Sequence, residues 1–510
     1  MHALFHLSKK DELLLRIRQH EKLSTAEQLH LTALLSVPAI LAQLSSILMF
    51  YIDDAMVGSL GALASASIGI IATTTWLFWS IISCVATGFS VQVAHLVGAN
   101  DLSRARDVFR QSLLAAMVIA ALTMIVGVLI ANPLPLWLGG GEDIAYDASR
   151  YFFIFILGTP MAMINMLASA MLRCAGNIKV PSLANIVMCV LDVLFNFFLI
   201  FPTRTISLTS AFSHQPSALL SQLSTFNFQL SSLTSNLSPL TFQFSIPGLG
   251  LGVEGAAIGT LAAETITAAF LLWYAATRCP ELRLKHAKGS LVPERPILRK
   301  AFDIAGPVFL QRVLMNAAQI VTTIIVAPLG AVAIAANALG VTAESLCYMP
   351  GYGIGEAATT LVGQSYGARR YRLTDRFAWM TTLIGMAVMT LMGIVMYFAA
   401  PLMMASLTPD EAVRQLGVEC LRIEAWAEPG FAASIVAMSC FIGVGDTKKP
   451  SLMNLFSMWF VRVTLAALLA PKYGLHGVWL GMAIELTFRG LIFLIRLKWE
   501  NWMKIPITRK

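Results

Sequence analysis

The chain has 510 residues, of which 57% are hydrophobic and only 13% are charged, with a formal net charge of +8. A soluble globular domain is usually about a quarter charged, so this composition excludes an ordinary soluble protein. Apolar runs of about 18 or more residues recur along the chain, and each is long enough to cross a bilayer as a helix. We therefore predict an all-α polytopic membrane protein.

The first 30 residues carry several lysines and arginines but no apolar core followed by a small-residue cleavage site, so they do not form a cleavable signal. Ser24 and Glu27 have the spacing of a capping box at a helix start. We expect residues 1–30 to be a cytoplasmic segment, with the first helix entering the membrane near Thr32.

Hydropathy predicts twelve transmembrane helices at 31–56, 63–95, 105–131, 148–172, 180–202, 253–277, 299–327, 332–360, 376–402, 414–440, 450–470 and 475–496. Most lysines and arginines lie before the first helix, in the even-numbered loops and after the last helix. By the positive-inside rule, both termini are expected to be cytoplasmic. The positive charge thus indicates topology and not a nucleic-acid partner.

The chain contains an internal repeat. At an offset of 269 residues, GNIKVPSLAN (176–185) aligns with GDTKKPSLMN (445–454). The offset then falls to 222, so the first half carries 47 extra residues. Two six-helix halves that enter from the same side are parallel repeats, which are common in secondary transporters. The predicted domains are an N-lobe at 31–277, a cytoplasmic loop at 278–298, a C-lobe at 299–496 and a cytoplasmic tail at 497–510.

The extra residues form an insertion at 203–249, in a loop expected outside the cytosol. Alternation in TISLT, TFNFQL and TFQFSI favours short strands, although Leu219, Leu220, Leu223 and Phe226 also fit a helical face. The insertion is either a lid over the outer mouth or a decoration without a function.

The aspartates of the predicted first and fifth helices have no acidic counterpart in the second half of the repeat. Asp53 and Asp54 align with Thr322 and Thr323, and Asp192 aligns with Val461. A purely structural role would more naturally appear in both halves.

Helix geometry groups these polar residues into two ladders. Gln43, Ser46, Asp53 and Asp54 share an arc of about 100° on the first helix, and Asn185, Asp192 and Asn196 form one stripe on the fifth. If the ladders face each other, they form a carboxylate and amide site inside the first bundle.

Buried carboxylates in membranes usually mark ion or proton pathways. Burial disfavours the charged form, so such an acid can take up a proton near neutral pH, or it can hold a cation together with amide and hydroxyl oxygens. The alternative for Asp53 and Asp54 is a solvated position at the outer surface, because the first helix climbs roughly 33 Å before reaching them. Asp192 lies in the middle of its segment, where the functional interpretation is favoured.

Among the other acids, Glu356 in GYGIGEAATTLVGQ is the best second-half candidate because small residues surround it. For Glu424 and Glu428 we expect structural ion pairs, either with Arg422 on the same helix or with arginines of other helices, namely Arg312, Arg462 or Arg489. No nucleotide-binding P-loop and no metal-binding histidine spacing occurs, so we expect no cofactor. The seven dispersed cysteines predict core or lipid-facing positions without disulfides.

Several motifs resemble the multidrug and toxic compound extrusion (MATE) family. They are Pro38 followed by Asp53 and MVGSLG (56–61), LVGQSYGA (361–368), and the paired loops that begin at Gly176 and Gly445. The resemblance covers residues 30 to 496 apart from the insertion. It implies a two-lobed exporter of organic, often cationic, compounds, driven by an inward proton or sodium gradient.

The resemblance implies that Asp53 is the coupling carboxylate, with Asp54 as its neighbour. One branch of the family carries Asn followed four residues later by Asp on the fifth helix, whereas here Asp192 precedes Asn196. A sodium-type branch has a glutamate eight residues after the helix 7 proline, where this chain has Met315. This difference favours coupling in the first lobe.

We therefore predict H⁺- or Na⁺-driven export from the plasma (inner) membrane by a monomeric, non-enzymatic transporter. The coupling residues would be Asp53, Asp54, Asn185, Asp192 and Asn196. Its partners would be lipophilic, cationic small molecules and membrane lipids. The expected substrate cavity includes Gln43, Ser46, Glu356 and Met315.

The alternative within the superfamily is a lipid-linked oligosaccharide flippase, which would need a more basic cavity. The basic DRxGRR-like loop of major-facilitator transporters is absent. A channel would need like polar residues in both halves, and a membrane enzyme would need a clustered nucleophile.

Overall fold

The structure is a computed structural model, and it describes residues 9–208, 242–284, 292, 294–499 and 501–503. Most of the described chain is helical, as the composition predicts. The α-helices are α1 Lys9–Arg18, α2 Thr25–Gly58, α3 Ala62–Gly98, α4 Leu102–Ala131, α5 Leu134–Trp137, α6 Glu142–Cys174, α7 Lys179–Ile200, α8 Gly252–Thr277, α9 Arg295–Val326, α10 Ala331–Gly367, α11 Tyr371–Leu407, α12 Glu411–Glu424, α13 Glu428–Val444, α14 Lys448–Phe456 and α15 Thr464–Lys498. The other elements are the 3₁₀ helices η2 Ala327–Leu329 and η4 Asn501–Met503, the π-helix η3 Ser457–Val463, and the strands β1 Pro202–Leu208 and β2 Phe242–Leu249.

The internal repeat is visible in the backbone. At the sequence offset of 269, the helix starts coincide: Ala62 with Ala331, Leu102 with Tyr371, Glu142 with Glu411, and Lys179 with Lys448. Positive φ angles recur in the same register, at Gly61 and Gly330, Asn100 and Arg369, Gly176 and Gly445, and, at the offset of 222, Gly252 and Gly474. A positive φ is uncommon outside glycine, so these turns are equivalent features of two copies of one fold.

Ten helices among the described residues are long and apolar enough to cross a membrane. An eleventh crossing results if α12 and α13, which meet at 61°, together form one span. One of the ten, Lys448–Lys498, is 51 residues long and turns back at Gly474, so that Gly477 packs against Leu469. The expected number of twelve depends on counting its two arms separately. That number and the cytoplasmic position of the termini stay predictions.

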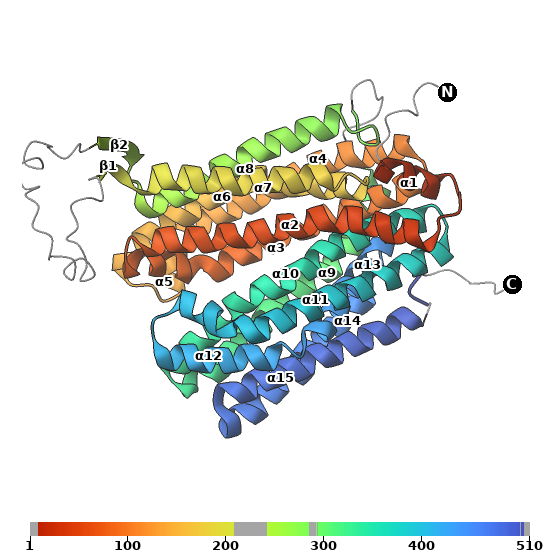
Figure 1. Ribbon diagram of the computed structural model, residues 1–510. Helices are drawn as coiled ribbons and strands as arrows, with labels where there is room; N and C mark the ends of the chain where they lie inside the picture. The colour runs from red at the N-terminus through yellow and green to blue at the C-terminus, as the bar shows by residue number, and fades with distance from the viewer. Residues whose placement is uncertain (1–8, 209–241, 285–291, 293, 500, 504–510) are drawn as a thin grey trace, which may run out of the picture.

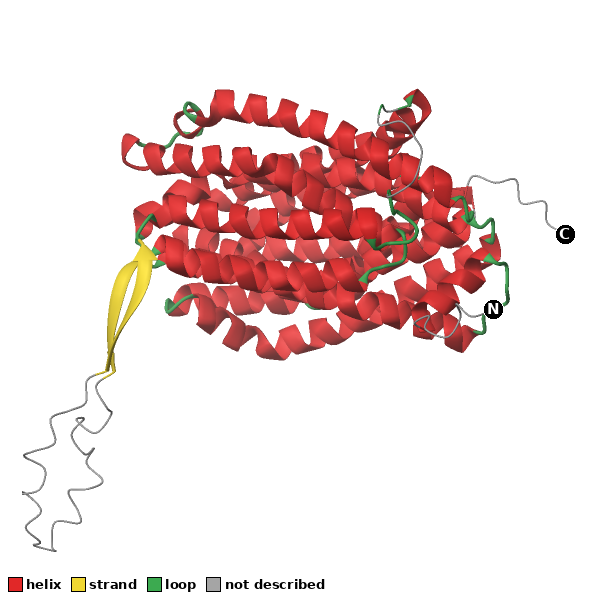
Figure 2. Ribbon diagram, turned by 90° about the horizontal axis from the view of Figure 1, so that it is seen from above, coloured by secondary structure: helices red, strands yellow, loops and turns green. Residues whose placement is uncertain are grey.

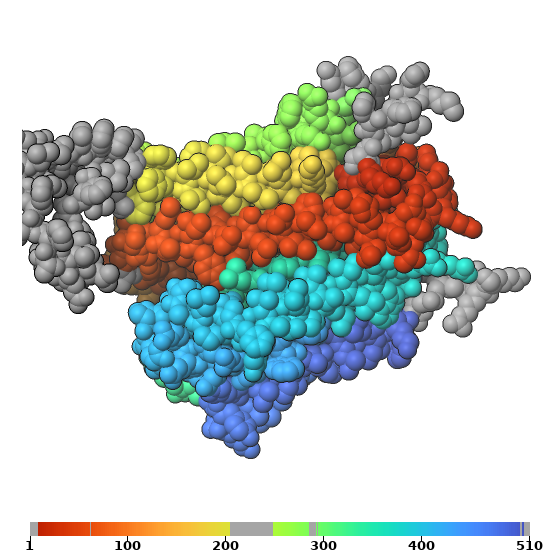
Figure 3. Space-filling model, viewed as in Figure 1, coloured from red at the N-terminus to blue at the C-terminus, as the bar shows by residue number. Residues whose placement is uncertain are grey.

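The two halves of the chain lie side by side with their helices roughly aligned (Figure 1). The space-filling view shows the same division, with the first half from red to green above the second half in cyan and blue (Figure 3). At one end of the bundle, Leu13 of α1 and Trp502 of η4 share a buried cluster. We call this the terminus end. The strands β1 and β2 extend from the opposite end, which we call the hairpin end (Figure 2).

Helices α3 and α10 touch backbone to backbone at the terminus end. A Cβ atom on Gly98 would lie 2.0 Å from the carbonyl oxygen of Gln364, and one on Gly367 would lie 2.0 Å from that of His95. Gly98 and Gly367 are equivalent in the repeat, so the two halves meet there through one symmetric contact. Only glycine permits so close an approach.

Helix α1 was not predicted. Its side chains Leu13, Leu14 and Ile17 are buried in a cluster that joins both halves and includes Leu31 of α2 and Phe377 of α11. Hydropathy does not detect this helix, because its charged residues outnumber the three large apolar residues that it buries. By contrast, the predicted capping box of Ser24 and Glu27 at the start of α2 is confirmed.

The surface of the bundle is apolar, as expected for helices that face lipid. Exposed large side chains include Leu129, Phe302, Phe398 and Leu402, each at least 73% exposed. All seven cysteines are buried and free of disulfides, which confirms their predicted role in packing.

The inserted segment begins and ends as a β-hairpin. Strand β1 pairs antiparallel with β2, with Thr205 opposite Ser245, and a bulge lies between Pro202 and Arg204. The strands predicted in TISLT and TFQFSI are thereby confirmed in their described parts. The predicted strand in TFNFQL and the helical face from Leu219 to Phe226 lie outside the described residues.

Candidate functional site

The polar ladders of α2 and α7 face each other, as the sequence required for a joint site. The Nδ2 atom of Asn185 on α7 donates to the carbonyl oxygen of Ala42 at 3.1 Å and to Oγ of Ser46 at 2.8 Å, both on α2. These bonds fix the register between the two helices. Ser46 is therefore part of the helix contact inside the first half.

About two helical turns further along, one amide connects two carboxylates. The Nδ2 atom of Asn196 donates to Oδ1 of Asp53 at 2.9 Å and to Oδ2 of Asp192 at 3.2 Å. Asp192 and Asn196 are fully buried, and Asp53 is partly exposed. The structure thus joins three of the five residues that the sequence proposed for coupling into one group, which we call the Asp–Asn–Asp site.

Helix α8 closes the site from the other side. A Cβ atom on Gly259 would lie 2.0 Å from Oδ1 of Asn196, so only glycine at this position leaves room for the amide. The hydroxyl of Thr260, next in the chain, donates to the carbonyl oxygen of Ala256 at 3.1 Å. Within the described residues, Oδ1 of Asp192 and Oδ1 of Asn196 are buried without a hydrogen-bond partner.

These unpartnered oxygens define what the site can do chemically. Two carboxylates and an amide oxygen in a buried place can share a proton or can surround a small cation, because both remove the electrostatic cost of the buried charge. Asp54 does not belong to this group. Its side chain is on the exposed side of α2, so it resembles the solvated alternative.

Glu356 lies where the two halves meet. The Nε2 atom of Gln43 on α2 donates to its Oε1 at 3.1 Å, and Arg173 on α6 forms an ion pair with the same oxygen at 3.5 Å. The sequence analysis missed Arg173. It could have been found through the repeat, because Arg173 aligns with Ile442 and is another charge present in one half only.

The residues expected at the substrate cavity are distributed over different contacts. Ser46 binds Asn185, whereas Gln43 and Glu356 bind each other across the halves. Met315 accepts from Nε2 of Gln311 at 3.4 Å, one turn away on α9. The described contacts do not join these four residues, so a shared cavity stays a prediction.

The expected ion pairs of Glu424 and Glu428 were wrong. Neither carboxylate has a hydrogen-bond partner among the described residues, although both side chains are fully buried. Arg489, which we expected to pair with one of them, forms a two-bond ion pair with Glu485 instead, with N–O distances of 2.7 Å. Residues four apart on one helix are neighbours on its surface, so Arg489 pairs with Glu485 and not with Glu424 or Glu428 on other helices.

A family model for MatE matches residues 38–198 and 307–468, which together span more than half of the chain and fall once in each half. The chain belongs to the MatE family. The doubled match coincides with the two copies of the repeat, and its first copy contains the whole Asp–Asn–Asp site. This MatE protein is therefore a multi-pass membrane protein with a two-lobed helical fold.

Relatives of this MatE protein cover almost its whole length. A probable multidrug resistance protein NorM of Thermotoga maritima is 23% identical over 93% of this chain and 94% of its own. The multidrug resistance protein NorM of Burkholderia vietnamiensis is 24% identical over 89% of this chain and 90% of its own.

Solved structures share the fold. A crystal structure of a MATE protein in complex with MaL6 has a TM-score of 0.81 at 18% identity, covering 97% of this chain and 100% of that chain. The Vibrio cholerae MATE transporter VcmN in its bent form has a TM-score of 0.75 at 18% identity, covering 98% of this chain and all of that chain.

Proposed function

We propose that this MatE protein exports lipophilic, cationic small molecules across the inner membrane by antiport with protons or sodium ions, as a monomer in contact with membrane lipids. Membership of the MatE family and the multidrug resistance names of its relatives support the substrate class. The coupling mechanism rests on the Asp–Asn–Asp site.

The observation that carries the proposal is the shared amide between Asp53 and Asp192. Two carboxylates held by one donor cannot both stay charged in a buried place without a further positive charge. A proton or a sodium ion supplies that charge, and its departure leaves repulsion between the acids. The site is therefore a two-state element whose occupancy can bias the position of α2 against α7 and α8.

Alternating access requires that the terminus end opens and closes. At this end the halves are joined by Nε2 of Gln364, which donates to the carbonyl oxygen of Cys174 at 2.9 Å, and by Thr360, which donates to that of Arg173 at 3.1 Å. We propose that these bonds and the ion pair of Arg173 with Glu356 break when this end opens.

Efflux of a fluorescent cationic dye from proteoliposomes tests the proposal, with a pH gradient and a sodium gradient imposed separately. We expect one of the two gradients to drive dye transport in the wild type. Asp53→Asn should reduce this transport to the level of empty liposomes, because the amide cannot exchange a proton or neutralise a cation.

Asp54→Asn is the matched control, since it makes the same chemical change one residue away on the exposed side of α2. Gradient-driven efflux that survives in Asp53→Asn would contradict the assignment of the coupling site. No gradient-driven efflux of any dye in the wild type would contradict the antiport mechanism and would favour the flippase alternative.

A further inference from the structure

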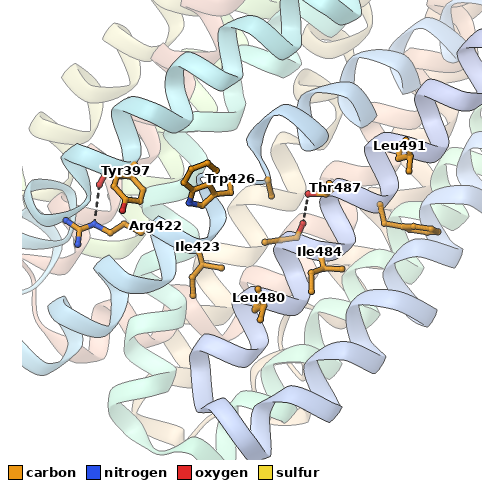
Figure 4. Close-up of a pocket in the computed structure, with 11 residues that line it drawn as sticks. Tyr397, Arg422, Ile423, Trp426, Leu480, Ile484, Thr487 and Leu491 are labelled. Atoms are coloured by element: carbon orange, nitrogen blue, oxygen red, sulfur yellow. Dashed lines mark hydrogen bonds between the residues drawn. The ribbon is translucent and has the colours of Figure 1, made fainter.

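The second half has a groove on its outer surface that the proposed mechanism does not use. A cavity of about 780 Å³ lies between α11, the junction of α12 with α13, and α15 (Figure 4). Trp426, Leu480 and Leu491 line it and are exposed, so it opens toward the lipid. Its volume falls within the range of about 300–1,000 Å³ that small-molecule sites occupy. We call it the lateral groove.

The two ends of the lateral groove differ in chemistry. Figure 4 shows Arg422 and Tyr397 at one end and Leu491 at the other. Leu480 and Ile484 of α15 lie between them. Arg422 is the one charged residue in the described lining. The groove therefore fits an occupant with one anionic end and an apolar body.

A proline in α11 explains how one atom of Arg422 is held. Pro401 lies inside α11 and has no N–H, so the carbonyl oxygen of Tyr397, four residues earlier, loses its partner in the helix. The Nε atom of Arg422 donates to this oxygen at 3.3 Å. The local structure thus uses one of the five N–H donors of the guanidinium group.

The rest of the guanidinium group is available to a ligand. Its central carbon lies 5.4 Å from the ring centre of Tyr397, which orients its plane. Glu419, three residues before Arg422 and thus near it on the helix surface, contacts Nε2 of His476 instead. Arg422 forms no ion pair within the described chain. Its Nη1 and Nη2 atoms therefore keep the paired donors that bind two oxygens of a phosphate.

Arg422 lies within the apolar surface and not at its edge. It is about 16 Å along α12 from Glu411, at the rise of an α-helix. On α11, Phe398 follows its contact residue Tyr397, and Leu402 is one turn closer to the hairpin end. Both are strongly exposed apolar side chains. A cation at this depth is rare in membrane proteins and usually marks a functional site with a polar partner.

The polar end of the groove is particular to the second half. The residues equivalent to Tyr397, Arg422 and Trp426 in the first half are all apolar. They are Val128, Phe153 and Leu157. The first half therefore presents an ordinary lipid-facing surface where the second half presents a cation between two aromatic rings.

We propose that the lateral groove binds an anionic phospholipid, whose phosphate contacts Nη1 and Nη2 of Arg422 and whose acyl chain lies along α15. Charge complementarity selects this occupant. A phosphate supplies the anion that Arg422 lacks, whereas no carboxylate in the described lining would receive the ammonium group of a zwitterionic lipid. The cationic compounds of the proposed export would be repelled by the same arginine.

The bound lipid connects three helices of the second half. Its headgroup contacts α11 and α12, and its chain contacts α15, next to the 61° bend between α12 and α13. A ligand that binds the folded state and not the unfolded chain stabilises the fold by mass action. Anionic phospholipid should therefore raise the thermal stability, whether or not Asp53 couples transport.

Native mass spectrometry of the purified protein tests the proposal without a transport assay. Delipidated protein in a neutral detergent is titrated with phosphatidylglycerol or with phosphatidylcholine of the same acyl chains. We expect the first phosphatidylglycerol molecule to bind about tenfold more tightly, the factor that corresponds to one hydrogen bond to a charged group. Equal affinity of the wild type for the two lipids would overturn the proposal.

Arg422→Gln separates lipid binding from the structural role of Arg422. Glutamine places an N–H near the position of Nε and can still donate to the carbonyl oxygen of Tyr397, but it has no charge and no paired donors. This variant should lose the preference for phosphatidylglycerol. Arg414→Gln is the matched control and should keep it, because Arg414 lies on the same helix, pairs with Glu411 and does not line the groove. A preference that survives in Arg422→Gln would overturn the site.

Tryptophan fluorescence locates the lipid and decides the matter if Arg422→Gln does not fold. Phosphatidylglycerol with brominated acyl chains quenches the tryptophans that it contacts. We expect quenching of the wild type to saturate at a low lipid-to-protein ratio, and Trp426→Phe to lose most of this saturable part. Trp137→Phe, which removes an exposed tryptophan of the first half, is the matched control. Saturable quenching that is unchanged in Trp426→Phe would overturn the lateral groove as the site.

Thermal denaturation distinguishes a lipid from a free anion. Phosphatidylglycerol should raise the Tm of the wild type more than that of Arg422→Gln, and inorganic phosphate should leave both unchanged. Inorganic phosphate that stabilises the wild type as much as the lipid does would overturn lipid binding in favour of a simple anion site.

Discussion

The two halves of this MatE protein share one backbone but carry different charges. In the first half, two aspartates share the amide of Asn196. In the second half, Glu485 is fully paired, whereas Glu424 and Glu428 have no partner among the described residues. The repeat preserves what helix packing needs, such as Gly98 and Gly367 at the crossing of α3 and α10. The buried charges, by contrast, differ between equivalent positions of the two halves, so helix packing alone does not dictate them.

The largest change in stability is expected from breaking the buried ion pair of Glu485 with Arg489. Arg489→Ala leaves the fully buried Glu485 without its partner, and the free energy of unfolding should fall by roughly 3–5 kcal/mol. Chemical denaturation in mixed micelles measures this change. Glu485→Leu/Arg489→Leu should recover most of it, because both charges are removed together. A double variant as unstable as Arg489→Ala would mean that packing, and not charge, dominates this contact.

In the first half, Asn196→Ala removes the donor that Asp53 and Asp192 share. We expect a loss of about 1–3 kcal/mol, because the fully buried Asp192 and the partly buried Asp53 both lose their hydrogen-bond donor. The change should also alter the pH dependence of dye efflux. Asn185→Ala is the control, since it loosens α7 from α2 without touching a carboxylate. Equal pH profiles for both variants would argue against a special role for the shared amide.

The backbone contact between α3 and α10 should lose the same amount of stability when either of its two equivalent glycines is replaced. Gly98→Ala and Gly367→Ala each place a methyl group against a backbone carbonyl, and each should reduce stability by about 1–3 kcal/mol. Gly69→Ala, where nothing lies within 4 Å of the added atom, should be neutral or stabilising. Thermal denaturation compares the three variants. A clear difference between Gly98→Ala and Gly367→Ala would break the symmetry inferred from the backbone.

The smallest effect is expected from Asp54→Asn. Its side chain is exposed and stands outside the Asp–Asn–Asp site, so stability should change by no more than about 0.5 kcal/mol. Dye efflux driven by either gradient should stay within the range of the wild type. An effect as large as that of Asp53→Asn would place Asp54 inside the coupling machinery.

Much of the first-half site was predictable because it depends on local spacing and on the repeat. The stripe of Asn185, Asp192 and Asn196 follows from helix periodicity, and comparison of the halves singled out Asp53 and Asp192. What the sequence did not reveal is the partner of each group. That one amide contacts both carboxylates, or that Glu356 meets Arg173, depends on how α2, α6, α7 and α10 cross.

The sequence by itself determined most of the long apolar helices, their doubling and the turns between them, because hydropathy and glycine positions act over short distances along the chain. It did not reveal the short helix α1 or the break between α12 and α13. Only the tertiary structure decided which charges are paired. Glu424 was expected to form an ion pair with an arginine, but Arg489 forms its ion pair with Glu485, one helical turn away. Glu424 and Glu428 are both buried next to the bend between α12 and α13. Which buried charges pair depends on the distances between helices. Those distances result from the packing of several helices together and cannot be read from the sequence of one helix.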